Sequence, residues 1–333
     1  MKILLTGATG FLGFRTLEKL VLMDEVSSII ATGRTIKRSH YLKHPKITYI
    51  LGELTDKAFV ASITQDVEYV IHAAALSSTW GKYKEFEDAN LHSQINLINA
   101  IQKNKILKYI YISTPSMYFD CTNRRDISED DPLPSKLINA YAATKRMAEI
   151  ELVNSGIPYV ILRPRALTGR GDTVIMPRLI IAYKKGKLKI IGNGKNIVDL
   201  TSVSNAVDAI ILGLKAEGRA LNQIYNITNG EAVNLWEKIT YVLSLMNEQL
   251  PQKKIPYWLV LSIAQIMEWK SKLTNMKEPV LTKYGVRVLA KSMTLDISKA
   301  RELLGYNPTV TTDESISEFI NWYTEYEKNQ TLP

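Results

Sequence analysis

The stretch 1-MKILLTGATGFLG-13 decides how this chain folds. The residues before Gly7 form a short apolar run typical of a β-strand, and Gly10 and Gly13 follow at the start of an amphipathic helix. Glycines in such a turn let backbone N–H groups approach a pyrophosphate at the positive end of the helix. Their spacing differs from the general dinucleotide fingerprint, but the strand–turn–helix context still predicts a dinucleotide site. The alternative is a plain tight turn.

Outward from this stretch, short apolar strands alternate with helices through the first half of the chain. Strands separated by helices imply right-handed crossovers and a parallel sheet, so we expect an α/β fold of the Rossmann, doubly wound type. Near-continuous apolar strands agree, because such a sheet buries both sides of each strand. The predicted strands are 2–6, 28–32, 47–51, 67–72, 108–113 and 158–163, and the predicted helices lie near 11–22, 56–65, 83–103 and 137–155.

After about residue 165 the alternation loosens. We expect a dinucleotide-binding Rossmann domain over 1–165, to which part of 195–217 returns, and a smaller C-terminal lobe over 166–333 that mainly binds substrate. Ligands in open α/β folds bind at the carboxyl edge of the sheet, where this lobe would pack. Strands are expected near 188–191, 197–201 and 223–227, and helices near 174–185, 203–217, 233–247, 296–304 and 312–328.

Composition narrows the class of protein. The 333 residues, 46% of them apolar, suffice for a large core, and the one cysteine, Cys121, allows neither an internal disulfide nor a cysteine-based metal site. The first strand follows Lys2 directly, which is unlike a signal peptide, and no apolar stretch approaches the roughly 20 residues of a transmembrane helix. The net charge of +9 comes without a basic-aromatic module. We expect a cytoplasmic protein with no metal, no nucleic-acid partner and no transmembrane span.

The end of the second strand predicts the cofactor. An acidic residue there would bind the ribose 2′-hydroxyl of NAD, whereas an arginine accommodates the 2′-phosphate of NADP. The chain reads 31-ATGR-34 and has no acid until Glu53, so Arg34, helped by Lys37 or Arg38, is the candidate phosphate ligand. We expect NADP(H) to be favoured, with NAD(H) as the alternative cofactor. A solvated basic loop is the alternative interpretation of these residues.

Catalytic chemistry is predicted from 141-YAATK-145. Tyr141 and Lys145 lie one turn apart on a predicted helix and share a face. A neighbouring cation favours the phenolate and lowers the tyrosine pKa, so the phenol can exchange a proton with an alcohol or ketone while hydride moves to or from nicotinamide. In isolation the pair would be an ordinary surface pair. The hydroxyl-rich run 113-STPSMY-118, expected at the same sheet edge, favours the catalytic interpretation.

In this order, these motifs resemble those of the extended short-chain dehydrogenases, which include NAD-dependent epimerases, dehydratases and 3β-hydroxysteroid dehydrogenases. Besides the glycine loop, 72-HAAA-75 resembles the family's strand-four motif, and 90-NLHSQINLINA-100 resembles its N-V-x-G-T-x-N-L-L-x-A helix. The resemblance implies catalytic roles for Thr114 (rather than Ser113), Tyr141, Lys145 and Asn90. It implies cofactor contacts from Gly7, Thr9, Gly10, Phe11, Leu12, Gly13, Arg34, Glu53, Leu54, His72, Ala73, Ala74, Ala75, Tyr141, Lys145 and Pro164.

Two segments depart from the family pattern. The family often has G-D-L after the third strand, where the acid contacts adenine, and this chain has 52-GEL-54, so Glu53 must reach with a longer side chain. The family's Tyr-Gly pair after the hydroxyl run is 118-YF-119 here, which changes the expected backbone geometry.

Segments of the second half indicate the branch of the family. The stretches 162–180, 192–210 and 224–236 resemble 3β-hydroxysteroid dehydrogenases, in particular sterol-4α-carboxylate 3-dehydrogenase and bacterial 2-alkyl-3-oxoalkanoate reductases. This resemblance implies an oxidoreductase that interconverts a secondary alcohol and a ketone on a bulky hydrophobic substrate. One alternative is a nucleotide-sugar epimerase or dehydratase, although these usually carry Asn in R-x-x-N-x-Y-G and this chain reads 163-RPRALTG-169. Another is a non-catalytic NADP-binding sensor, although such proteins often lack the tyrosine.

Two apolar surfaces carry further expectations. The helices near 83–103 and 137–155 resemble a pair that forms a homodimer interface in the family. The segment 255-IPYWLVLSIAQIMEW-269 has three interpretations: a core helix, an apolar lid over the substrate site, or a shallow membrane-surface helix that gives weak membrane association. The dimer candidates, which would otherwise pack within the subunit, are Ile95, Ile98, Met147 and Ile150.

Overall fold

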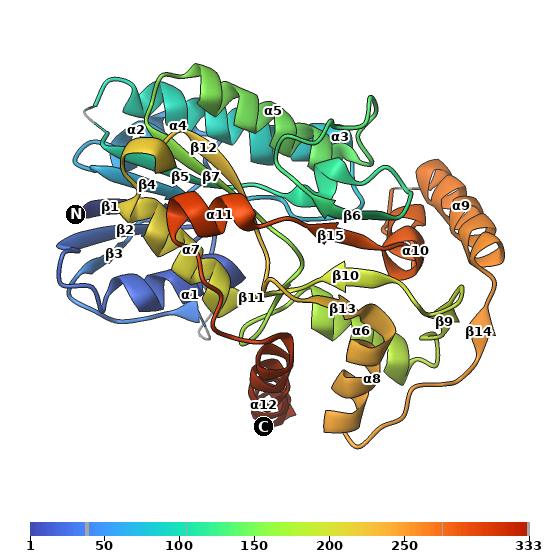
Figure 1. Cartoon of the computed structure of the whole chain (residues 1–333). Helices are drawn as coiled ribbons and strands as arrows, with labels where there is room; N and C mark the ends of the chain where they lie inside the picture. The colour runs from blue at the N-terminus through green and yellow to red at the C-terminus, as the bar shows by residue number, and fades with distance from the viewer. Residues whose placement is uncertain (37–39, 105, 275, 332–333) are drawn as a thin grey trace.

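Seven parallel strands form the central sheet, in the order β12-β7-β5-β4-β1-β2-β3 (Figure 1). This computed structural model describes residues 1–331 except 37–39, 105 and 275. The chain reverses its direction of progress across the sheet between β1 and β4, which creates a crevice at the carboxyl ends of the strands. The strands are β1 (Lys2–Thr6), β2 (Ser28–Thr32), β3 (Ile47–Tyr49), β4 (Tyr69–His72), β5 (Lys108–Ile112), β7 (Tyr159–Pro164) and β12 (Gln223–Ile227).

Helices cover both faces of this sheet, as the alternation of the sequence predicts. Strand β1 shows why: Ile3 and Leu5 pack into the core on one face, and Leu4 packs into the core on the other. The first face is covered by α1 (Phe11–Leu20), α7 (Val203–Lys215) and α11 (Ser298–Leu304), and the second by α2 (Lys57–Ile63), α4 (Ser93–Ile101) and α5 (Ala140–Asn154). The predicted α/β, Rossmann-type doubly wound fold is confirmed.

The predicted helix 83–103 contains a change of helical geometry. It begins as α3 (Tyr83–Phe86), continues as the π-helical stretch η2 (Glu87–His92) and ends as α4. Wide turns of this kind bulge a helix outward and often occur at functional sites. Asn90 lies within η2.

The second half adds a four-stranded sheet of order β13-β10-β15-β6 and two short strand pairs, β11-β8 and β14-β9. Strand β6 and helix α10 are not predicted from the sequence, and neither is β15, because they are too short to show a clear periodicity. Strand β12 joins the central sheet, so the return of the chain extends beyond 195–217. The remaining elements are β6 (Arg124–Ile127), β8 (Leu167–Thr168), β9 (Ile190–Ile191), β10 (Ile197–Asp199), β11 (Thr201–Ser202), β13 (Ala232–Asn234), β14 (Lys254–Ile255), β15 (Met293–Leu295), α6 (Ile175–Lys184), α8 (Leu235–Leu245), α9 (Tyr257–Leu273), α10 (Lys283–Ala290), α12 (Thr312–Thr331), and the 3₁₀ turns η3 (Pro115–Tyr118) and η4 (Gly218–Ala220).

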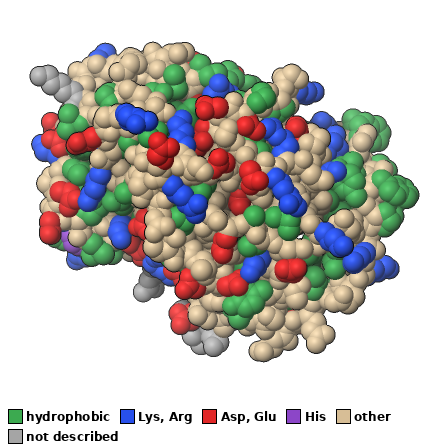
Figure 2. Space-filling view, viewed as in Figure 1, with side chains coloured by type: hydrophobic (Ala, Val, Ile, Leu, Met, Phe, Trp, Pro, Cys, Tyr) green, Lys and Arg blue, Asp and Glu red, His purple; other side chains and the backbone are tan. Residues whose placement is uncertain are grey.

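Helix α9 lies on the surface, so the interpretation of 255–269 as a core helix is wrong. Only a narrow stripe of α9, which includes Val260 and Ala264, is buried. The apolar side chains on the other sides face solvent: Trp258 is 68% exposed, Ile266 65% and Trp269 66%. Figure 2 shows hydrophobic side chains gathered over α9 at the right-hand edge of the molecule. No helix in the described part of the chain is long and apolar enough to cross a membrane.

The dimer candidates divide into two groups. Ile98 is buried in the core between the sheet and α4, so its expected place in an interface is wrong. Ile95 is partly buried against the same core. Met147 and Ile150 are exposed on α5. Of the four candidates, Met147 and Ile150 therefore present exposed apolar side chains.

Candidate active site

The glycine loop between β1 and α1 is packed too tightly for side chains. Gly7 has φ +70°, and a Cβ atom there would lie 2.7 Å from the backbone nitrogen of Ala74. A Cβ on Gly13 would lie 2.0 Å from the carbonyl oxygen of Gly7. Gly10 precedes the first turn of α1, and no side chain caps this turn. The loop is therefore a bare backbone cradle at a helix N-terminus, which fits the pyrophosphate of a dinucleotide.

A hydrogen-bond chain ties this loop to the end of β4. The Thr6 hydroxyl lies 2.6 Å from Nδ1 of His72 and accepts the backbone N–H of Ala74 at 3.3 Å. His72 is fully buried and stacks on Tyr111. Burial and the charge of Lys145 hold the pKa of His72 well below its usual value. The His72 imidazole is therefore neutral and packs within the sheet edge. Ala74 and the exposed Ala75 lie next to the glycine loop.

The end of β2 lies beside the same loop. A Cβ on Gly33 would meet the Thr9 hydroxyl at 2.2 Å, so the backbone that leads to Arg34 passes directly over Thr9. Arg34 is exposed, as is Glu53. Lys37 and Arg38 lie outside the described residues. Phe11, Leu12, Leu54, Ala73 and Pro164 are buried or partly buried.

Tyr141 stands in the first turn of α5. Asn139 caps this helix by accepting the backbone N–H of Ala142 at 2.9 Å, which fixes where the helix begins. Burial raises the pKa of the Tyr141 hydroxyl, and hydrogen bonds from Ser77 and Thr114 oppose the rise. The prediction that Lys145 lowers this pKa is wrong for the free protein, because burial is the largest effect and Lys145 is not among the groups that shift it.

The Lys145 side chain reaches from α5 to β5. Its ammonium donates to the carbonyl oxygen of Ile112 at 2.6 Å and lies 4.0 Å from the centre of the Tyr111 ring. Burial lowers the pKa of Lys145 to about 7, and the charge of Glu149 opposes this shift. A lysine with this pKa exchanges its proton near neutral pH, which suits proton transfer at the site.

Thr114, and not its neighbour, is hydrogen-bonded within the site. Its hydroxyl lies 2.9 Å from the Ser116 hydroxyl and accepts the backbone N–H of Ser116 at 3.2 Å. The same side chain lies close enough to the Tyr141 hydroxyl to lower its pKa. The buried hydroxyl of Ser113 has no partner among the described residues.

From the π-helical turn, Asn90 joins the loop after β4 to helix α5. Its side-chain oxygen accepts the backbone N–H of Leu76 at 2.8 Å, and its amide nitrogen donates to Thr144 on α5 at 3.2 Å. Asn90 is therefore placed to hold the loop after β4 against the helix that carries Tyr141.

Sequence reasoning missed several residues of the site. Ser77, on the loop after β4, hydrogen-bonds Tyr141 and carries no recognisable motif. Asn139 could have been found as a helix cap, since it directly precedes the predicted helix. Arg165, directly after β7, and Tyr284, on α10, belong to segments without a periodic pattern.

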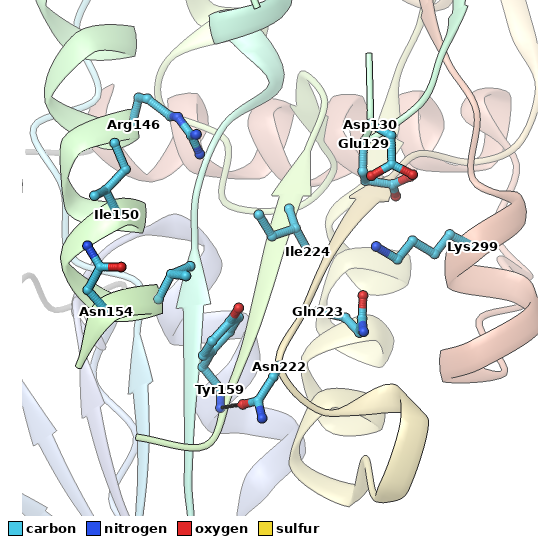
Figure 3. A pocket seen from close by; sticks show the side chains of 11 residues that line it. Glu129, Asp130, Arg146, Ile150, Asn154, Tyr159, Asn222, Gln223, Ile224 and Lys299 are labelled. Carbon is cyan, nitrogen blue, oxygen red and sulfur yellow. Dashed lines mark hydrogen bonds between the residues drawn. The ribbon is translucent and has the colours of Figure 1, made fainter. Parts of the chain in front are cut away.

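A separate groove of about 330 Å³ lies between α5 and the edge strand β12 (Figure 3). Figure 3 shows Arg146 and Ile150 on one side and Lys299 of α11 on the other. None of the predicted catalytic residues lines this groove, so we do not assign the reaction to it. Within the described residues, no three histidine, cysteine or acidic side chains are grouped so that they could hold a metal ion.

Comparison with known proteins identifies the family. The model of the "NAD dependent epimerase/dehydratase family" matches residues 3–228. The chain belongs to this family. The match includes the glycine loop, the hydroxyl run and the Tyr141–Lys145 pair, so the predicted extended short-chain dehydrogenase/reductase is confirmed.

Relatives with assigned activities are similar over most of their length. The chain is 33% identical to 3beta-hydroxysteroid-dehydrogenase/decarboxylase isoform 1 of Arabidopsis thaliana, over 88% of this chain and 70% of that one. It is 31% identical to 2-alkyl-3-oxoalkanoate reductase of Stenotrophomonas maltophilia, over 95% and 97%. It is 27% identical to sterol-4-alpha-carboxylate 3-dehydrogenase, decarboxylating, of Bos taurus, over 97% and 92%. The predicted branch is confirmed by these similarities.

Solved structures confirm the fold. The crystal structure of UDP-glucuronic acid 4-epimerase from Bacillus cereus in complex with NAD superposes with a TM-score of 0.77, at 22% identity, over 98% of this chain and 97% of that one. The prediction of an NAD(P)-dependent enzyme of the short-chain dehydrogenase/reductase type thus agrees with family, relatives and fold.

Proposed function

We propose that the protein uses a nicotinamide cofactor to interconvert a secondary alcohol and a ketone on a bulky hydrophobic substrate. The observation that carries the proposal is the buried Tyr141 hydroxyl, which lies close enough to Thr114 for this side chain to lower its pKa and which stands at the same sheet edge as the glycine cradle. A substrate oxygen bound there would sit against both hydroxyls. The relatives named above support an oxidoreductase over an epimerase.

In this mechanism the nicotinamide ring, when bound, accepts or supplies the hydride. Tyr141 takes the hydroxyl proton during oxidation and returns it during reduction, while Thr114 holds the substrate oxygen. Lys145, with its pKa of about 7, is a buried group on the same helix that can exchange a proton near neutral pH. Asn90 is a positioning residue, because it hydrogen-bonds the loop and helix around the site.

The residues around the loop would bind the cofactor. Gly7, Thr9, Gly10, Phe11, Leu12 and Gly13 form or flank the pyrophosphate cradle, and Glu53 and Leu54 lie toward the adenine. The loop after β4 and Pro164 would enclose the remaining ribose and nicotinamide, with His72 holding that edge in place from within the sheet. The NAD complex of the Bacillus cereus epimerase supports this placement for the shared fold.

We further propose a preference for NADP(H) over NAD(H), with Arg34 bound to the 2′-phosphate. A charge-assisted hydrogen bond contributes about 1.5–3 kcal/mol, so the preference would be roughly tenfold or more. Titration of both cofactors, followed by intrinsic tryptophan fluorescence, tests it. Arg34→Ala should weaken NADP(H) binding and leave NAD(H) binding unchanged, and the exposed Arg125→Ala serves as the charge-matched control. Equal or tighter binding of NAD(H) by the unaltered protein would contradict the preference.

The substrate is tested by a hydride-transfer screen. The protein is assayed with both cofactors against sterols, long-chain 3-hydroxy acids and nucleotide sugars. Turnover of either hydrophobic class, lost in Tyr141→Phe, supports the proposal. Activity on nucleotide sugars alone would establish the epimerase or dehydratase alternative, and cofactor binding without any turnover would establish the sensor.

The protein is proposed to act in the cytoplasm as a homodimer through α5. Met147, Ile150 and Val153 form an exposed apolar row on this helix, and Tyr83 adds to it by donating its hydroxyl hydrogen bond to the Met147 sulfur at 3.6 Å. Sedimentation at micromolar concentration measures the oligomeric state. The exposed face of α9 would at most give weak, reversible contact with membranes, since its lysines lie near its end and not along one face.

A further inference from the structure

Arg165 occupies a fixed place at the carboxyl edge of the central sheet. It directly follows β7, its backbone N–H donates to Ile227 of β12 at 3.0 Å, and its carbonyl oxygen accepts the hydroxyl of Thr201. The side chain is 7% exposed. The arginine is therefore held firmly, in the same row of strand ends that carries Thr114.

Among the described residues, this buried guanidinium has no bonded partner. Its Nε makes no hydrogen bond with them, and none of their carboxylates forms an ion pair with the side chain. A guanidinium has five donors, and burying an ion without compensation is costly unless a ligand supplies the missing charge. The donor set, a planar fork with unused N–H groups, fits a carboxylate.

Two neighbouring groups place Arg165 relative to the reaction. Asp199 on β10 lies near enough for Arg165 to lower its pKa, yet burial is the larger effect and raises that pKa to about 6, and the carboxylate accepts the backbone N–H of Leu295 at 2.6 Å. Asp199 thus compensates the arginine only from a distance. Asp126 is the other acidic group that acts on Asp199.

The second neighbour is Tyr284 on α10, which packs edge-on against Phe119 with 6.1 Å between the ring centres. Burial raises the pKa of Tyr284, and the charge of Arg165 opposes the rise. Tyr284 in turn acts on the pKa of Tyr141. Arg165 and Tyr141 therefore both lie close enough to Tyr284 for their charges to act on one another.

We propose that Arg165 is a specificity-determining residue that binds a carboxylate of the substrate close to the reacting carbon, so that the enzyme acts on 3-hydroxy or 3-oxo acids with a large apolar remainder. This inference rests on the proposed oxidoreductase function. In oxidation the carbinol C–H leaves as hydride to the nicotinamide and the O–H proton goes to Tyr141, while the carboxylate stays bound and unchanged. The printed names of two relatives, an oxoalkanoate reductase and a sterol carboxylate dehydrogenase, describe substrates of this arrangement.

The test compares a long-chain 3-hydroxy acid with its methyl ester, which keeps the carbinol and the chain but removes the charge. Oxidation of both is measured with the full-length protein and its preferred cofactor. The unaltered protein should have a higher kcat/KM for the acid, by roughly tenfold to a hundredfold, the value of about 1.5–3 kcal/mol for a charge-assisted contact. Arg165→Gln should remove this ratio by raising KM for the acid, and leave the ester within about twofold of its original value.

Controls separate recognition from structure. Arg125→Gln removes an exposed positive charge and should change neither substrate. Arg165→Lys keeps the charge without the fork and should retain part of the ratio. If Arg165→Gln does not fold, the role of Arg165 is tested by the ratio of kcat/KM for the acid to that for the ester, measured in the unaltered protein and in Arg165→Lys. A lower ratio in Arg165→Lys supports the role, and an unchanged ratio contradicts it.

The possible failures are distinct. Turnover of the ester equal to that of the acid, or an equal loss on both substrates in Arg165→Gln, overturns the role of Arg165 while the oxidoreductase function stands. Turnover of neither substrate, together with inactivity on uncharged alcohols and ketones, contradicts the proposed function and the inference with it.

Discussion

Two arginines at the end of β7, Arg163 and Arg165, show how the interior of the scaffold differs from the candidate site. Arg163 is 2% exposed and donates from Nε and a terminal nitrogen to the two oxygens of Glu149, at 2.8 and 2.6 Å. Arg165, two residues later, is almost as buried and has no such partner. Since both belong to the same segment of sheet, burial alone does not distinguish them. A buried charge that is paired holds the fold, and one that is not paired indicates where a ligand binds.

The contrast extends beyond the two arginines. Under α5, Arg163 also contacts Tyr118, whose hydroxyl donates to Asn226 at 3.1 Å, and Asn226 donates its backbone N–H to Glu129 at 2.6 Å. At the carboxyl edge, by contrast, several strands end in or beside buried polar atoms that have no partner in the described structure. They are Thr32 Oγ1 at the end of β2, His72 Nε2 at the end of β4, Ser113 Oγ directly after β5 and Arg165 Nε directly after β7.

The largest expected effect lies on the site side of this comparison. Tyr141→Phe should lower turnover by roughly 10²–10⁴-fold, the usual value of positioned proton transfer, and leave the fold and cofactor affinity intact. Steady-state kinetics and cofactor titration measure both. Tyr83→Phe, the same change at an exposed tyrosine, is the control and should leave turnover and cofactor affinity unchanged. Near-normal turnover in Tyr141→Phe would reject the assignment of this residue.

On the scaffold side, the expected effect is on stability. Arg163→Gln removes the buried partner of Glu149 and leaves this buried carboxylate with only the more exposed Arg146, so it should lower the free energy of unfolding by about 3–5 kcal/mol. Chemical denaturation measures the loss. Arg146→Gln is a matched control, because Arg146 binds the same carboxylate at 3.2 Å from a more exposed position, and should cost under about 1 kcal/mol. A similar loss of unfolding free energy in Arg163→Gln and Arg146→Gln would contradict the idea that the buried ion pair stabilises the fold more than the exposed one.

Sequence patterns predicted the parts of this molecule that are local. The glycine cradle and the Tyr141–Lys145 spacing are fixed by short-range geometry, and the strand–helix alternation is fixed by burial on both faces. The contacts that complete the site are long-range: Ser77 reaches Tyr141 across the sheet edge, and Tyr284 reaches it from α10. No periodicity reports such contacts, because they depend on how the second lobe folds back. Helix α9 shows a different problem, since its apolar composition left three interpretations open, and the packing covers only a narrow stripe of it.

The pKa of Lys145 predicts a smaller, pH-dependent effect. Its folded-state pKa of about 7 lies below the ordinary value of 10.5, so between these values the unfolded chain binds a proton that the folded protein does not. The free energy of unfolding should therefore rise with pH in this window, by at most about 1.4 kcal/mol per pH unit from this group. Below pH 7 both states carry the charge, so the free energy of unfolding no longer changes with pH because of this group. Denaturation of the unaltered protein and of Lys145→Met at several pH values isolates it, and parallel stability curves would contradict the shift.

The smallest expected effect tests the site at single-residue resolution. Thr114 and Ser113 are adjacent buried hydroxyls, but of the two Thr114 is the one that acts on the pKa of Tyr141, while Ser113 has no partner among the described residues. A hydrogen bond between neutral groups contributes about 0.5–1.5 kcal/mol, so Thr114→Ala should slow turnover by roughly threefold to tenfold, or more if the bond strengthens as charge develops on the substrate oxygen. Thr114→Ser keeps the hydroxyl and should be milder. Ser113→Ala removes a hydroxyl that has no partner and should leave the rate near normal. If Ser113→Ala is the damaging change, the hydroxyl without a partner is the one that binds substrate. In that case an unpartnered buried group indicates the ligand site for Ser113 and Thr114, as it does for Arg165 and Arg163.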